Sequence, residues 1–285
     1  MSALIGDTLD IAFNAPVLSE DLFRQMRDYF FQETGITINQ NKKYLVEYRL
    51  QKFVGPDKQF ASYAELFNAL KKDSSGELKT LFINSLTTNY TFFFREPVHF
   101  RFLAHYLQNY GKKQDYIRLW SAGCSSGEEA YSMAITCLEQ GFAGSGRDIR
   151  ILATDISRKV LSKAQSGVYH YSAIRGELPD TYLRRFFTFN PRDKTFTVKE
   201  QVRSMVSFRE FNLMDPFPFT KQFDVVFLRN VLIYFNAPEK ELILEKIVEV
   251  LKEPGYLILG LSESLVGIRH RFTTLSNSIY RKDGK

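Results

Sequence analysis

The apolar residues of the first 86 positions recur three and four apart, a pattern that predicts several short helices. Ser19 is a candidate N-cap for the first helix, and Gly35 is its expected end. Ser62 and Glu65 have the spacing of a capping box for a later helix. The predicted apolar faces contain Leu22, Met26 and Phe30, then Val46, Leu50 and Phe53, then Leu66, Phe67 and Leu70. No strand-type alternation interrupts the pattern, so we expect an all-helical domain over residues 15–86.

The pattern changes after residue 115, where short apolar runs alternate with helical segments. The runs have the length of buried strands and occupy residues 116–120, 149–155, 223–229 and 256–262. The helical segments cover residues 127–140, 156–166 and 237–252. Strands that alternate with helices are typical of a parallel sheet with helices on both faces, so this part of the chain is predicted to be an α/β domain.

One segment departs from this alternation. Residues 186–199 have the pattern of a β-hairpin that turns at Asn190–Lys194. We therefore expect a small β-subdomain over about residues 186–203, inserted in the α/β domain.

Composition excludes several classes of protein. Hydrophobic residues make up 44% of the 285 positions and charged residues 25%, as in a soluble globular protein. No apolar run approaches the roughly 18 residues that suggest a membrane-spanning helix, so no direct membrane insertion is expected. Cys124 and Cys137 are too few for a disulfide framework and favour a reducing cytoplasm. The four histidines lack ligand spacing, so no metal site is expected.

The net charge of +6 narrows the classes of partner without deciding among them. The isoelectric point of about 9.1 suits a nucleic acid, an anionic membrane or an acidic protein surface. Residues 1–86 contain 10 basic and 11 acidic residues, so the positive excess lies further along the chain.

Candidate chemistry follows the predicted strands, because ligands of open α/β sheets bind beyond the carboxyl ends of the strands. The first strand is followed by SAGCSSGEEAYS, in which Gly123 and Gly127 permit a tight turn and close backbone approach. The segment lacks the Gly-Lys-Ser/Thr of a phosphate-binding loop, and Glu128 and Glu129 would repel a pyrophosphate. These acids suit a ligand that is cationic or that carries hydroxyl and amino groups.

Asp155 ends the second strand, where a carboxylate can accept two hydrogen bonds from a ribose diol. For this residue alone, an aspartate that caps the following helix is the alternative interpretation. Together with the glycine and acid turn, Asp155 favours a nucleoside that carries positive charge and no pyrophosphate. S-adenosylmethionine has these properties.

Polar residues also follow two further strands. Asn212 and Leu213, in FNLMD, suit the edge and the face of an adenine. Arg229 and Asn230, in FLRNVLIYF, are expected at the lip of the sheet. Tyr234 in the same stretch is either a site residue or a core aromatic with a satisfied hydroxyl.

The stretch SLTTNYTFFFREPVHF, residues 85–100, combines hydroxyls, an amide, three phenylalanines and a guanidinium. Pro97 is expected to begin a helix with Phe100, Leu103 and Leu107 on its apolar face. A hydrophobic linker with an incidental arginine is the alternative.

The order and spacing of LTTNYTFFFREPVHF, WSAGCSSGEEAYS, ILATDIS, FNLMD and FLRNVLIYF resemble the CheR family, the S-adenosylmethionine-dependent glutamate O-methyltransferases of bacterial chemoreceptors. The resemblance covers nearly the whole chain and implies a class I, Rossmann-like methyltransferase domain over residues 98–285. It also implies that residues 87–97 are a linker that folds over the cofactor, with the phenylalanines closing the pocket against water. The implied cofactor contacts are Asn89, Thr91, Arg95, Glu129, Asp155, Asn212, Leu213, Arg229 and Asn230, and the residues implied to lie nearest the transferred methyl group are Arg95 and Tyr234.

By the same resemblance, glutamates of methyl-accepting chemotaxis receptors would become methyl esters in sensory adaptation, with S-adenosylhomocysteine as the second product. The implied partner is the cytoplasmic helical domain of these receptors, which would recruit a monomeric cytoplasmic enzyme to receptor arrays. Two alternatives stay open: an RNA methyltransferase, which fits the isoelectric point, and a non-catalytic cofactor-sensing scaffold. No nucleic-acid partner is expected, because the helical domain lacks the interleaved aromatic and basic residues of RNA-binding modules.

Two surfaces are candidates for recognition of the receptor. Lys42, Arg49 and Lys52 recur at helical spacing, and we expect them to form an exposed basic face that docks acid-rich receptor helices; a solvated face without a partner is the alternative. In the CheR family the β-subdomain can bind the receptor's carboxyl-terminal peptide as an added strand, and residues 195–198 have the β-propensity for this pairing. The turn NPRDK lacks glycine, so we expect a structural hairpin and weak or no peptide binding.

Overall fold

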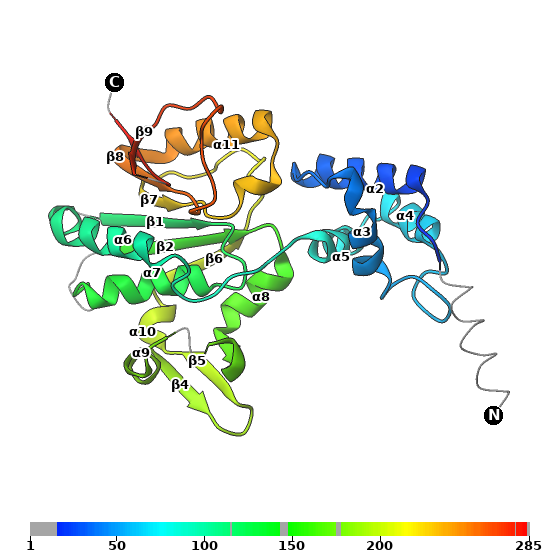
Figure 1. The fold of residues 1–285 in the computed structure, drawn as a ribbon. Coiled ribbons are helices and arrows are strands. Elements are labelled where there is room, and N and C mark those ends of the chain that lie inside the picture. The colour runs from blue at the N-terminus through cyan, green and yellow to red at the C-terminus, as the bar shows by residue number, and fades with distance from the viewer. Residues whose placement is uncertain (1–15, 115, 143–147, 175–177, 277, 284–285) are drawn as a thin grey trace. The chain divides into compact units, whose positions relative to one another are not determined.

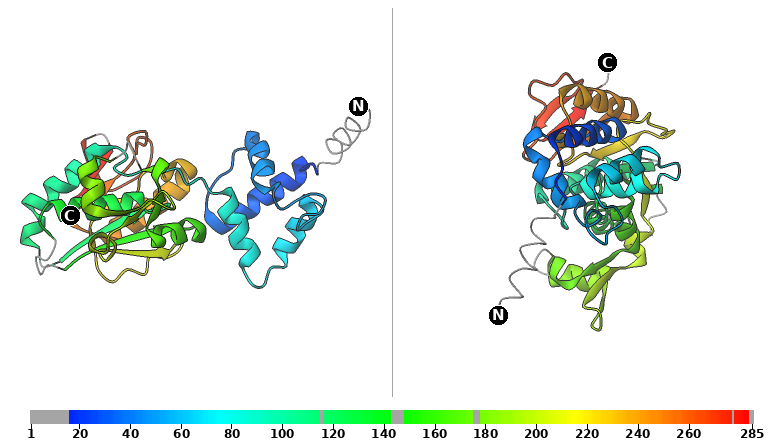
Figure 2. Two further views of the ribbon diagram at one scale, coloured as in Figure 1. Left: turned by 90° about the horizontal axis from the view of Figure 1, so that it is seen from below. Right: turned by 90° about the vertical axis from the view of Figure 1, so that its right-hand side faces the viewer.

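Four helices of the described chain make up the N-terminal unit, which ends at Thr87. The computed structural model describes residues 16–114, 116–142, 148–174, 178–276 and 278–283, so residue 15, where the helical domain is predicted to begin, lies outside them. The helices are α2 (Glu20–Thr34), α3 (Lys43–Leu50), α4 (Tyr63–Lys71) and α5 (Glu77–Leu86), with a 3₁₀ turn over Gln40–Lys42 before α3. Figures 1 and 2 show α3 beside α5.

The predicted caps of this unit are confirmed. Ser19 Oγ accepts a hydrogen bond from the Leu22 amide (3.2 Å), and Gly35 closes α2 in the left-handed conformation at φ 70°. Ser62 Oγ accepts one from the Glu65 amide (3.2 Å). The buried faces contain Phe23, Met26 and Phe30 in α2, Val46 and Leu50 in α3, Leu66, Phe67 and Leu70 in α4, and Phe82, Ile83 and Leu86 in α5. Leu22 is only half-buried, because it lies in the first turn and Phe23 takes the core position.

A seven-stranded sheet organises the second unit, which begins at Thr88. Its strands are β1 (Tyr116–Ala122), β2 (Asp148–Asp155), β6 (Val206–Glu210), β7 (Phe223–Phe227), β8 (Leu251–Ile258), β9 (Thr273–Ser276) and β10 (Ile279–Lys282). Their order across the sheet is β6-β2-β1-β7-β8-β10-β9. All pairings from β6 to β8 are parallel, whereas β10 runs antiparallel to β8 and β9. The predicted α/β fold is confirmed, but the sheet is mixed and not all-parallel.

The antiparallel pairing of β9 with β10 follows from the short connection between them. Only two residues separate these strands, and so short a connection joins antiparallel neighbours, since parallel strands need a crossover. The apolar pattern does not predict this pair because each strand has four residues and β9 is exposed throughout. The start of β8 is also earlier than predicted, at Leu251, because the first residues of the strand include the polar Lys252 and Glu253, which precede the apolar run that the pattern shows.

Helices cover both faces of the sheet, as shown by its central strands. All five residues of β7 and the last four of β1 are buried. The helices are α6 (Pro97–Asn109), α7 (Glu128–Glu139), α8 (Arg158–Ser166) and α11 (Ala237–Val250). As predicted, α6 begins at Pro97 and buries Phe100, Leu103 and Leu107. Figure 1 shows α6 and α7 side by side along β1 and β2.

A small antiparallel sheet projects from this unit at its lower end in Figure 1. It consists of β3 (Val168–His170), β4 (Phe187–Asn190) and β5 (Thr195–Val198), accompanied by the short helices α9 (Asp180–Phe186) and α10 (Glu200–Arg203). The predicted hairpin is therefore confirmed, and a third strand completes it. The pattern did not predict β3 because three residues are too few to show a period.

The order of the small sheet agrees with the expected structural hairpin. β5 is the central strand, paired with β3 on one side and β4 on the other, so residues 195–198 have no free edge for an added peptide strand. A groove of about 490 Å³ lies beside the sheet and is lined by Tyr171, Asp180, Leu183, Arg184, Phe187, Phe189 and Phe196.

A buried histidine fastens α6 to the antiparallel strands. His99 Nε2 lies 2.8 Å from Ser278 Oγ, just before β10, and the ring is fully buried. Burial and the nearby Arg229 guanidinium lower the pKa of His99 to about 4, although the Glu96 carboxylate opposes the shift. The imidazole is therefore neutral in the folded protein at neutral pH.

We predict that protonation of His99 destabilises the second unit in acid. The unfolded imidazole protonates near pH 6.5 and the folded one near pH 4, so the unfolded state takes up the proton first as the pH falls. The contribution of neutral His99 to the free energy of unfolding is fully present above about pH 6.5, and by pH 5 this free energy has fallen by about 2 kcal/mol. Urea unfolding followed by the fluorescence of Trp120, the single tryptophan, measures this loss.

His99→Gln should flatten the pH dependence of unfolding between pH 7 and pH 5. The matched control is His105→Gln, an exposed position on the same helix, which should retain the wild-type slope. A slope that is the same in all three proteins would contradict the assignment to His99.

Candidate functional site

Two glycines shape the loop between β1 and α7. Gly123 has a φ of 84°, and a Cβ there would lie 2.4 Å from Val231 Cγ2. Gly127 has a φ of 97°, and a Cβ there would lie 2.8 Å from the Ala164 Cβ of α8. The loop is thus pressed against the segment after β7 on one side and against α8 on the other. Glycine is required because it permits both the left-handed backbone and this close approach.

Asp155, at the end of β2, joins this loop to the segment before α8. Its Oδ2 accepts the Ser125 amide (2.8 Å) and its Oδ1 accepts the Ser157 amide (2.9 Å). Burial raises the pKa of the Asp155 carboxyl above its ordinary value, although these amide hydrogen bonds oppose the shift. The helix-capping interpretation accounts for the bond to Ser157. The Ile156 amide also bonds this carboxylate, so three of its roughly four acceptor positions are used and one is left for a ribose hydroxyl.

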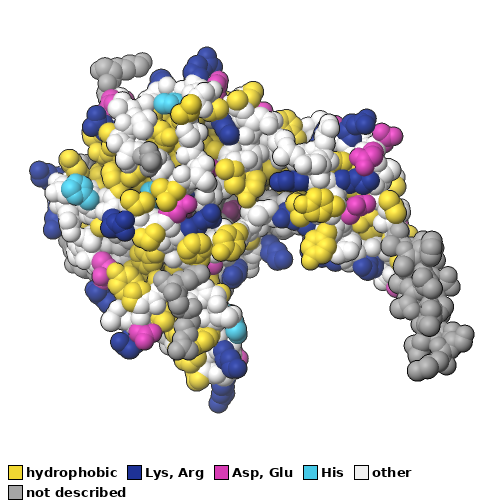
Figure 3. Space-filling view, in the orientation of Figure 1, with side chains coloured by type: hydrophobic (Ala, Val, Ile, Leu, Met, Phe, Trp, Pro, Cys, Tyr) yellow, Lys and Arg dark blue, Asp and Glu magenta, His cyan; other side chains and the backbone are white. Residues whose placement is uncertain are grey.

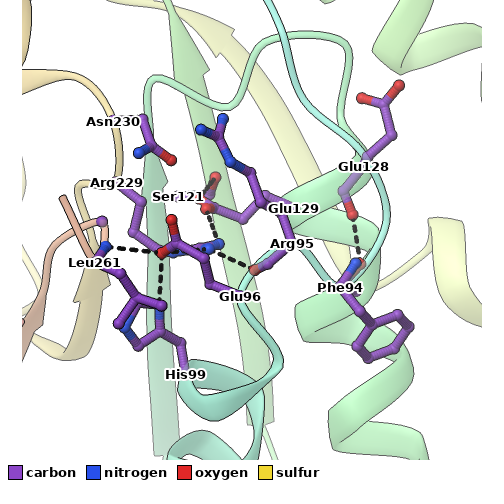
Figure 4. Close-up of polar contacts among 12 residues, drawn as sticks. Phe94, Arg95, Glu96, His99, Ser121, Glu128, Glu129, Arg229, Asn230 and Leu261 are labelled. Carbon is purple, nitrogen blue, oxygen red and sulfur yellow. Dashed lines mark hydrogen bonds and ion pairs between the residues drawn. The ribbon is translucent and has the colours of Figure 1, made fainter. Parts of the chain in front are cut away.

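A buried arginine holds several segments together behind these loops (Figure 4). Arg229 follows β7, and its side chain is 1% exposed. Its Nη1 lies 2.8 Å from Glu129 Oε2, and its Nη2 lies 3.0 Å from Glu96 Oε2. The guanidinium also donates to the Arg95 carbonyl. The buried cation is thus matched by two carboxylates, which offsets the cost of removing its charge from water.

The two carboxylates extend this network to other segments. Glu129 Oε1 accepts a hydrogen bond from Ser121 Oγ (2.7 Å), so both of its oxygens are engaged. Glu96 Oε2 accepts the Leu261 amide (3.0 Å), after β8. Burial opposes ionisation of Glu96, but the hydrogen bond and charge of Arg229 outweigh it and lower the pKa of the carboxyl. The charged groups of Glu129 and Arg229 are paired with each other. A contact of either residue with the cofactor stays a prediction.

Arg95 differs from Arg229 in its surroundings. Its carbonyl faces Arg229, whereas its half-buried guanidinium extends away from that residue (Figure 4). Arg95 Nη1 donates to the Tyr90 carbonyl (3.0 Å), and the guanidinium lies 5.8 Å and 5.9 Å from the ring centres of Tyr90 and Phe92. Among the residues that the structure describes, no carboxylate lies within ion-pair distance of Arg95. Its charge is therefore available to an anionic group of a ligand.

Two of the three linker phenylalanines anchor the chain and do not close a pocket. Phe93 is buried against the Tyr169 ring of β3, with ring centres 5.0 Å apart. Phe94 packs edge-to-face on Tyr182 of α9, with ring centres 5.7 Å apart. Phe92 alone of the run lies beside the arginine described above. The expectation that all three shield the cofactor is corrected, because two are used to attach the linker to the small sheet and its helix.

Polar contacts tie the same linker to the glycine loop and to α7. The Phe94 amide donates to Ser132 Oγ (2.9 Å), and Ser125 Oγ donates to the Asn89 carbonyl (3.1 Å). The side chains of Asn89 and Thr91 are half-buried. Their contacts with a cofactor stay predictions.

The loop after β6 lies next to Asp155, because the Phe211 amide donates to the Asp155 carbonyl (3.0 Å). Asn212 is half-buried and Leu213 is buried, so their positions agree with the site although their contacts with adenine stay predictions. Lys246 of α11 donates its Nζ to the Leu213 carbonyl (2.5 Å) and fixes this loop. Burial lowers the pKa of Lys246.

Asn230 and Tyr234 lie in a tight turn after β7. Asn230 has a φ of 58°, and its amide donates to Glu263 Oε2 (2.6 Å). Tyr234 ends a 3₁₀ turn that begins at Leu232, and its side chain is half-buried. Tyr234 is therefore not a fully buried core aromatic. Its role near the methyl group stays a prediction.

The structure brings the predicted residues of the second unit to one end of the sheet. The linker and the segments after β1, β2, β6 and β7 carry Asn89, Thr91, Arg95, Glu129, Asp155, Asn212, Leu213, Arg229, Asn230 and Tyr234. The predicted site residues did not include Glu96, Lys246 or Glu263, which hold these segments. Glu263 follows a buried strand, as Asp155 does, so the same signal could have identified it. Lys246 lies within a helix and carries no such signal.

The predicted basic face of the N-terminal unit is only partly exposed. Arg49 is half-buried and donates its Nη1 to the carbonyls of Leu86 (2.5 Å) and Thr87 (3.2 Å). It thereby satisfies carbonyls at the end of α5, which corrects the expectation that Arg49 is an exposed docking residue. Lys42 and Lys52 are exposed.

Two tyrosines accompany the exposed lysines. Tyr44 and Tyr48, four residues apart on α3, are 67% and 69% exposed. Lys52 lies four residues further along. We call Lys42, Tyr44, Tyr48 and Lys52 the α3 surface. Figure 3 shows hydrophobic side chains among Lys and Arg on this unit.

Grouped metal ligands and membrane-spanning helices are both absent from the described part of the chain. There, no three His, Cys, Asp or Glu side chains are grouped as metal ligands would be. No helix of this part is both long and apolar enough to cross a bilayer.

Comparison with known families agrees with this geometry. The family description "CheR methyltransferase, SAM binding domain" matches residues 89–281, and "CheR methyltransferase, all-alpha domain" matches residues 21–87. The predicted class I methyltransferase fold with an N-terminal helical domain is thereby confirmed.

Curated relatives match over most of their length. The chain is 37% identical to the chemotaxis protein methyltransferase of Borreliella burgdorferi, over 89% of this chain and 91% of that one. It is 38% identical to chemotaxis protein methyltransferase Cher2 of Pseudomonas putida, over 86% and 91%. It is 34% identical to the chemotaxis protein methyltransferase of Escherichia coli, over 92% and 91%. The chain therefore belongs to the CheR methyltransferase family and is an S-adenosylmethionine-dependent methyltransferase.

Proposed function

We propose that this enzyme methylates glutamate side chains of methyl-accepting chemotaxis receptors, which forms glutamyl methyl esters during sensory adaptation. The observation that carries the proposal is the contrast between the two arginines of the site. Arg229 is buried and matched by two carboxylates, whereas Arg95 has no carboxylate partner among the described residues. A guanidinium that is left unpaired at the cofactor site suits an acceptor that is itself a carboxylate.

The residues at the carboxyl end of the sheet fit the cofactor that the family uses. When bound, S-adenosylmethionine supplies an electrophilic methyl group on a positively charged sulfur. Asp155 would hold the ribose through the acceptor position that its three amide bonds leave open. Asn212 and Leu213 would hold the adenine, and the remaining contacts would come from Asn89, Thr91, Arg95, Glu129, Arg229 and Asn230.

The acceptor chemistry requires little proton transfer. A glutamate carboxylate has an ordinary pKa of about 4.3 and is ionised at neutral pH, so it needs no general base. The contribution of the protein is to align the carboxylate with the methyl group. Arg95 would orient the carboxylate through its guanidinium, and Tyr234 would add a hydrogen bond. The rings of Tyr90 and Phe92 beside Arg95 would reduce its contact with water.

An interaction of moderate strength between Arg95 and the acceptor carboxylate suits this orienting role. A bidentate ion pair of full strength would stabilise the ground state as much as the transition state and would not raise the rate. Arg95 already uses Nη1 on the Tyr90 carbonyl, which leaves fewer donors for the acceptor. The arginine would therefore orient the carboxylate and still release the neutral ester.

We assign receptor recognition to the N-terminal unit. The α3 surface presents two lysines and two tyrosines to solvent. Tyrosine supplies contact area with a polar tip, and lysine supplies charge that attracts acid-rich helices. The partner would be the cytoplasmic helical domain of the receptors, which would bring a monomeric cytoplasmic enzyme to receptor arrays.

The alternatives make different demands on the same residues. An RNA methyltransferase could use the lysines and tyrosines of the α3 surface on a nucleic acid. A non-catalytic scaffold would bind the cofactor without consuming it. The identity of the methylated product separates the three functions.

We predict base-labile methyl incorporation into receptor from labelled S-adenosylmethionine, and none into RNA from the same organism. Arg95→Ala should lower the turnover at saturating cofactor and receptor about tenfold or more, because one charge-assisted contact to the acceptor is lost. Tyr234→Phe should lower it less. Arg101→Ala, which removes an exposed arginine of α6, is the matched control and should keep wild-type turnover. Label in RNA, or no label with intact cofactor binding, would reject the proposal.

Charge reversal on the α3 surface tests the assignment of recognition. We expect Lys42→Glu with Lys52→Glu to raise the KM for receptor about tenfold and to leave the turnover at saturation unchanged. Added salt should raise the wild-type KM, because screening weakens attraction between exposed charges. The matched control is Lys72→Glu, an exposed lysine at the end of α4.

Arg49→Glu should behave differently from these lysine variants. Because Arg49 binds the carbonyls that end α5, its reversal should lower the stability of the helical unit as measured by its melting temperature. A KM for receptor that changes neither with added salt nor in the variant with Lys42→Glu and Lys52→Glu would contradict a role of the α3 surface in recognition.

A further inference from the structure

Glu263 is a buried carboxylate that the proposed chemistry does not use. Glu263 follows β8 and is 8% exposed. Its Oε2 accepts the amides of Asn230 (2.6 Å) and Gly260 (2.8 Å), and its Oε1 accepts the Ile233 amide (3.3 Å). Burial raises the pKa of Glu263, and the amide hydrogen bonds oppose the shift. One side chain thus binds main-chain groups of two separate segments.

The segment that Glu263 holds is the turn after β7, residues 228–235. Asn230 has a φ of 58° in this turn, a conformation that asparagine adopts more readily than most residues. Gly260 lies against it so closely that a Cβ there would be 2.4 Å from Asn230 Nδ2. The 3₁₀ turn that ends at Tyr234 begins directly after this point. Glu263 therefore fixes both a strained residue and the start of the turn that carries the tyrosine.

The same turn supports the glycine loop. Val231 lies against Gly123 with no room for a side chain between them. The amides of Gly123 and Cys124 both donate to the Thr154 carbonyl (2.8 Å each), and the loop continues to Asp155 through the Ser125 amide. A movement of the turn after β7 would therefore be passed to the groups around Asp155.

We propose that Glu263 is the positioning residue of this site: it holds residues 230–234 by their amides and so sets the places of Asn230, Tyr234 and the Gly123 loop for the cofactor. This inference rests on the proposed cofactor site. Glu263 touches neither the cofactor nor the acceptor in this account, and it acts through the main chain. Two acceptor oxygens are needed, because the amides that it binds approach both of them.

Glu263→Gln is the informative variant because it keeps the size of the side chain. The amide group of glutamine has one acceptor oxygen, and its NH₂ would face a main-chain N–H that has lost its partner. We expect the Kd for S-adenosylhomocysteine, measured by calorimetry, to rise about tenfold at unchanged stoichiometry. We expect the turnover at saturating substrates to fall as well. Glu245→Gln, at an exposed position of α11, removes the same charge and should change neither value.

Hydrogen exchange separates this role from a general loss of stability. In Glu263→Gln the amides of residues 230–234 should exchange faster, while those of β2 keep their protection. A variant that has the wild-type Kd and turnover, or that loses protection evenly over the second unit, would overturn the inference. If the wild type binds S-adenosylhomocysteine but methylates no receptor, the proposed function fails while the exchange result still decides the role of Glu263.

Discussion

The pairing of Arg229 with Glu96 and Glu129 is the interaction on which the site depends. A buried guanidinium, here with a 1% exposed side chain, needs matched charges, and removal of one partner from a buried pair costs about 3–5 kcal/mol of stability. The two carboxylates come from different places, one from the linker before α6 and the other from the start of α7. Through Leu261 and Ser121 the network also reaches the segments after β8 and β1. The ends of separate elements are thereby held together at one edge of the sheet.

Because of this pairing, two arginines that are 134 residues apart in the chain have different roles. Arg229 has a structural role, because its charge is used within the protein. Arg95 is held through its carbonyl by Arg229, and its guanidinium donates to the Tyr90 carbonyl. The same network that fixes the linker therefore leaves the Arg95 guanidinium without a carboxylate partner among the described residues. In the proposed function, a receptor glutamate supplies that carboxylate.

Local pattern predicted the parts of this molecule that depend on neighbours in sequence. The caps at Ser19 and Ser62, the helix that begins at Pro97 and the hairpin at residues 187–198 all follow from short-range rules. Asp155 could be identified because a polar residue after a buried strand lies at the ligand-binding edge.

Other features depend on contacts between distant residues. The sequence does not reveal that Arg49 meets the end of α5, that β10 enters between β8 and β9, or that Phe93 faces the small sheet. Arg229 was predicted from its place after β7, but only its burial against Glu96 and Glu129 reveals a structural role. Glu263 follows a predicted strand and could have been singled out on that ground, but only the structure reveals that it binds main-chain amides of the turn after β7.

A crystal structure of the protein with S-adenosylhomocysteine tests the central claim most directly. The account predicts that Arg229 keeps both of its carboxylate partners, that the ribose hydroxyls bind Asp155, and that the Arg95 guanidinium faces the sulfur without a protein carboxylate beside it. An Arg229 side chain that leaves Glu96 or Glu129 to bind the ligand, or a ribose bound away from Asp155, would contradict it.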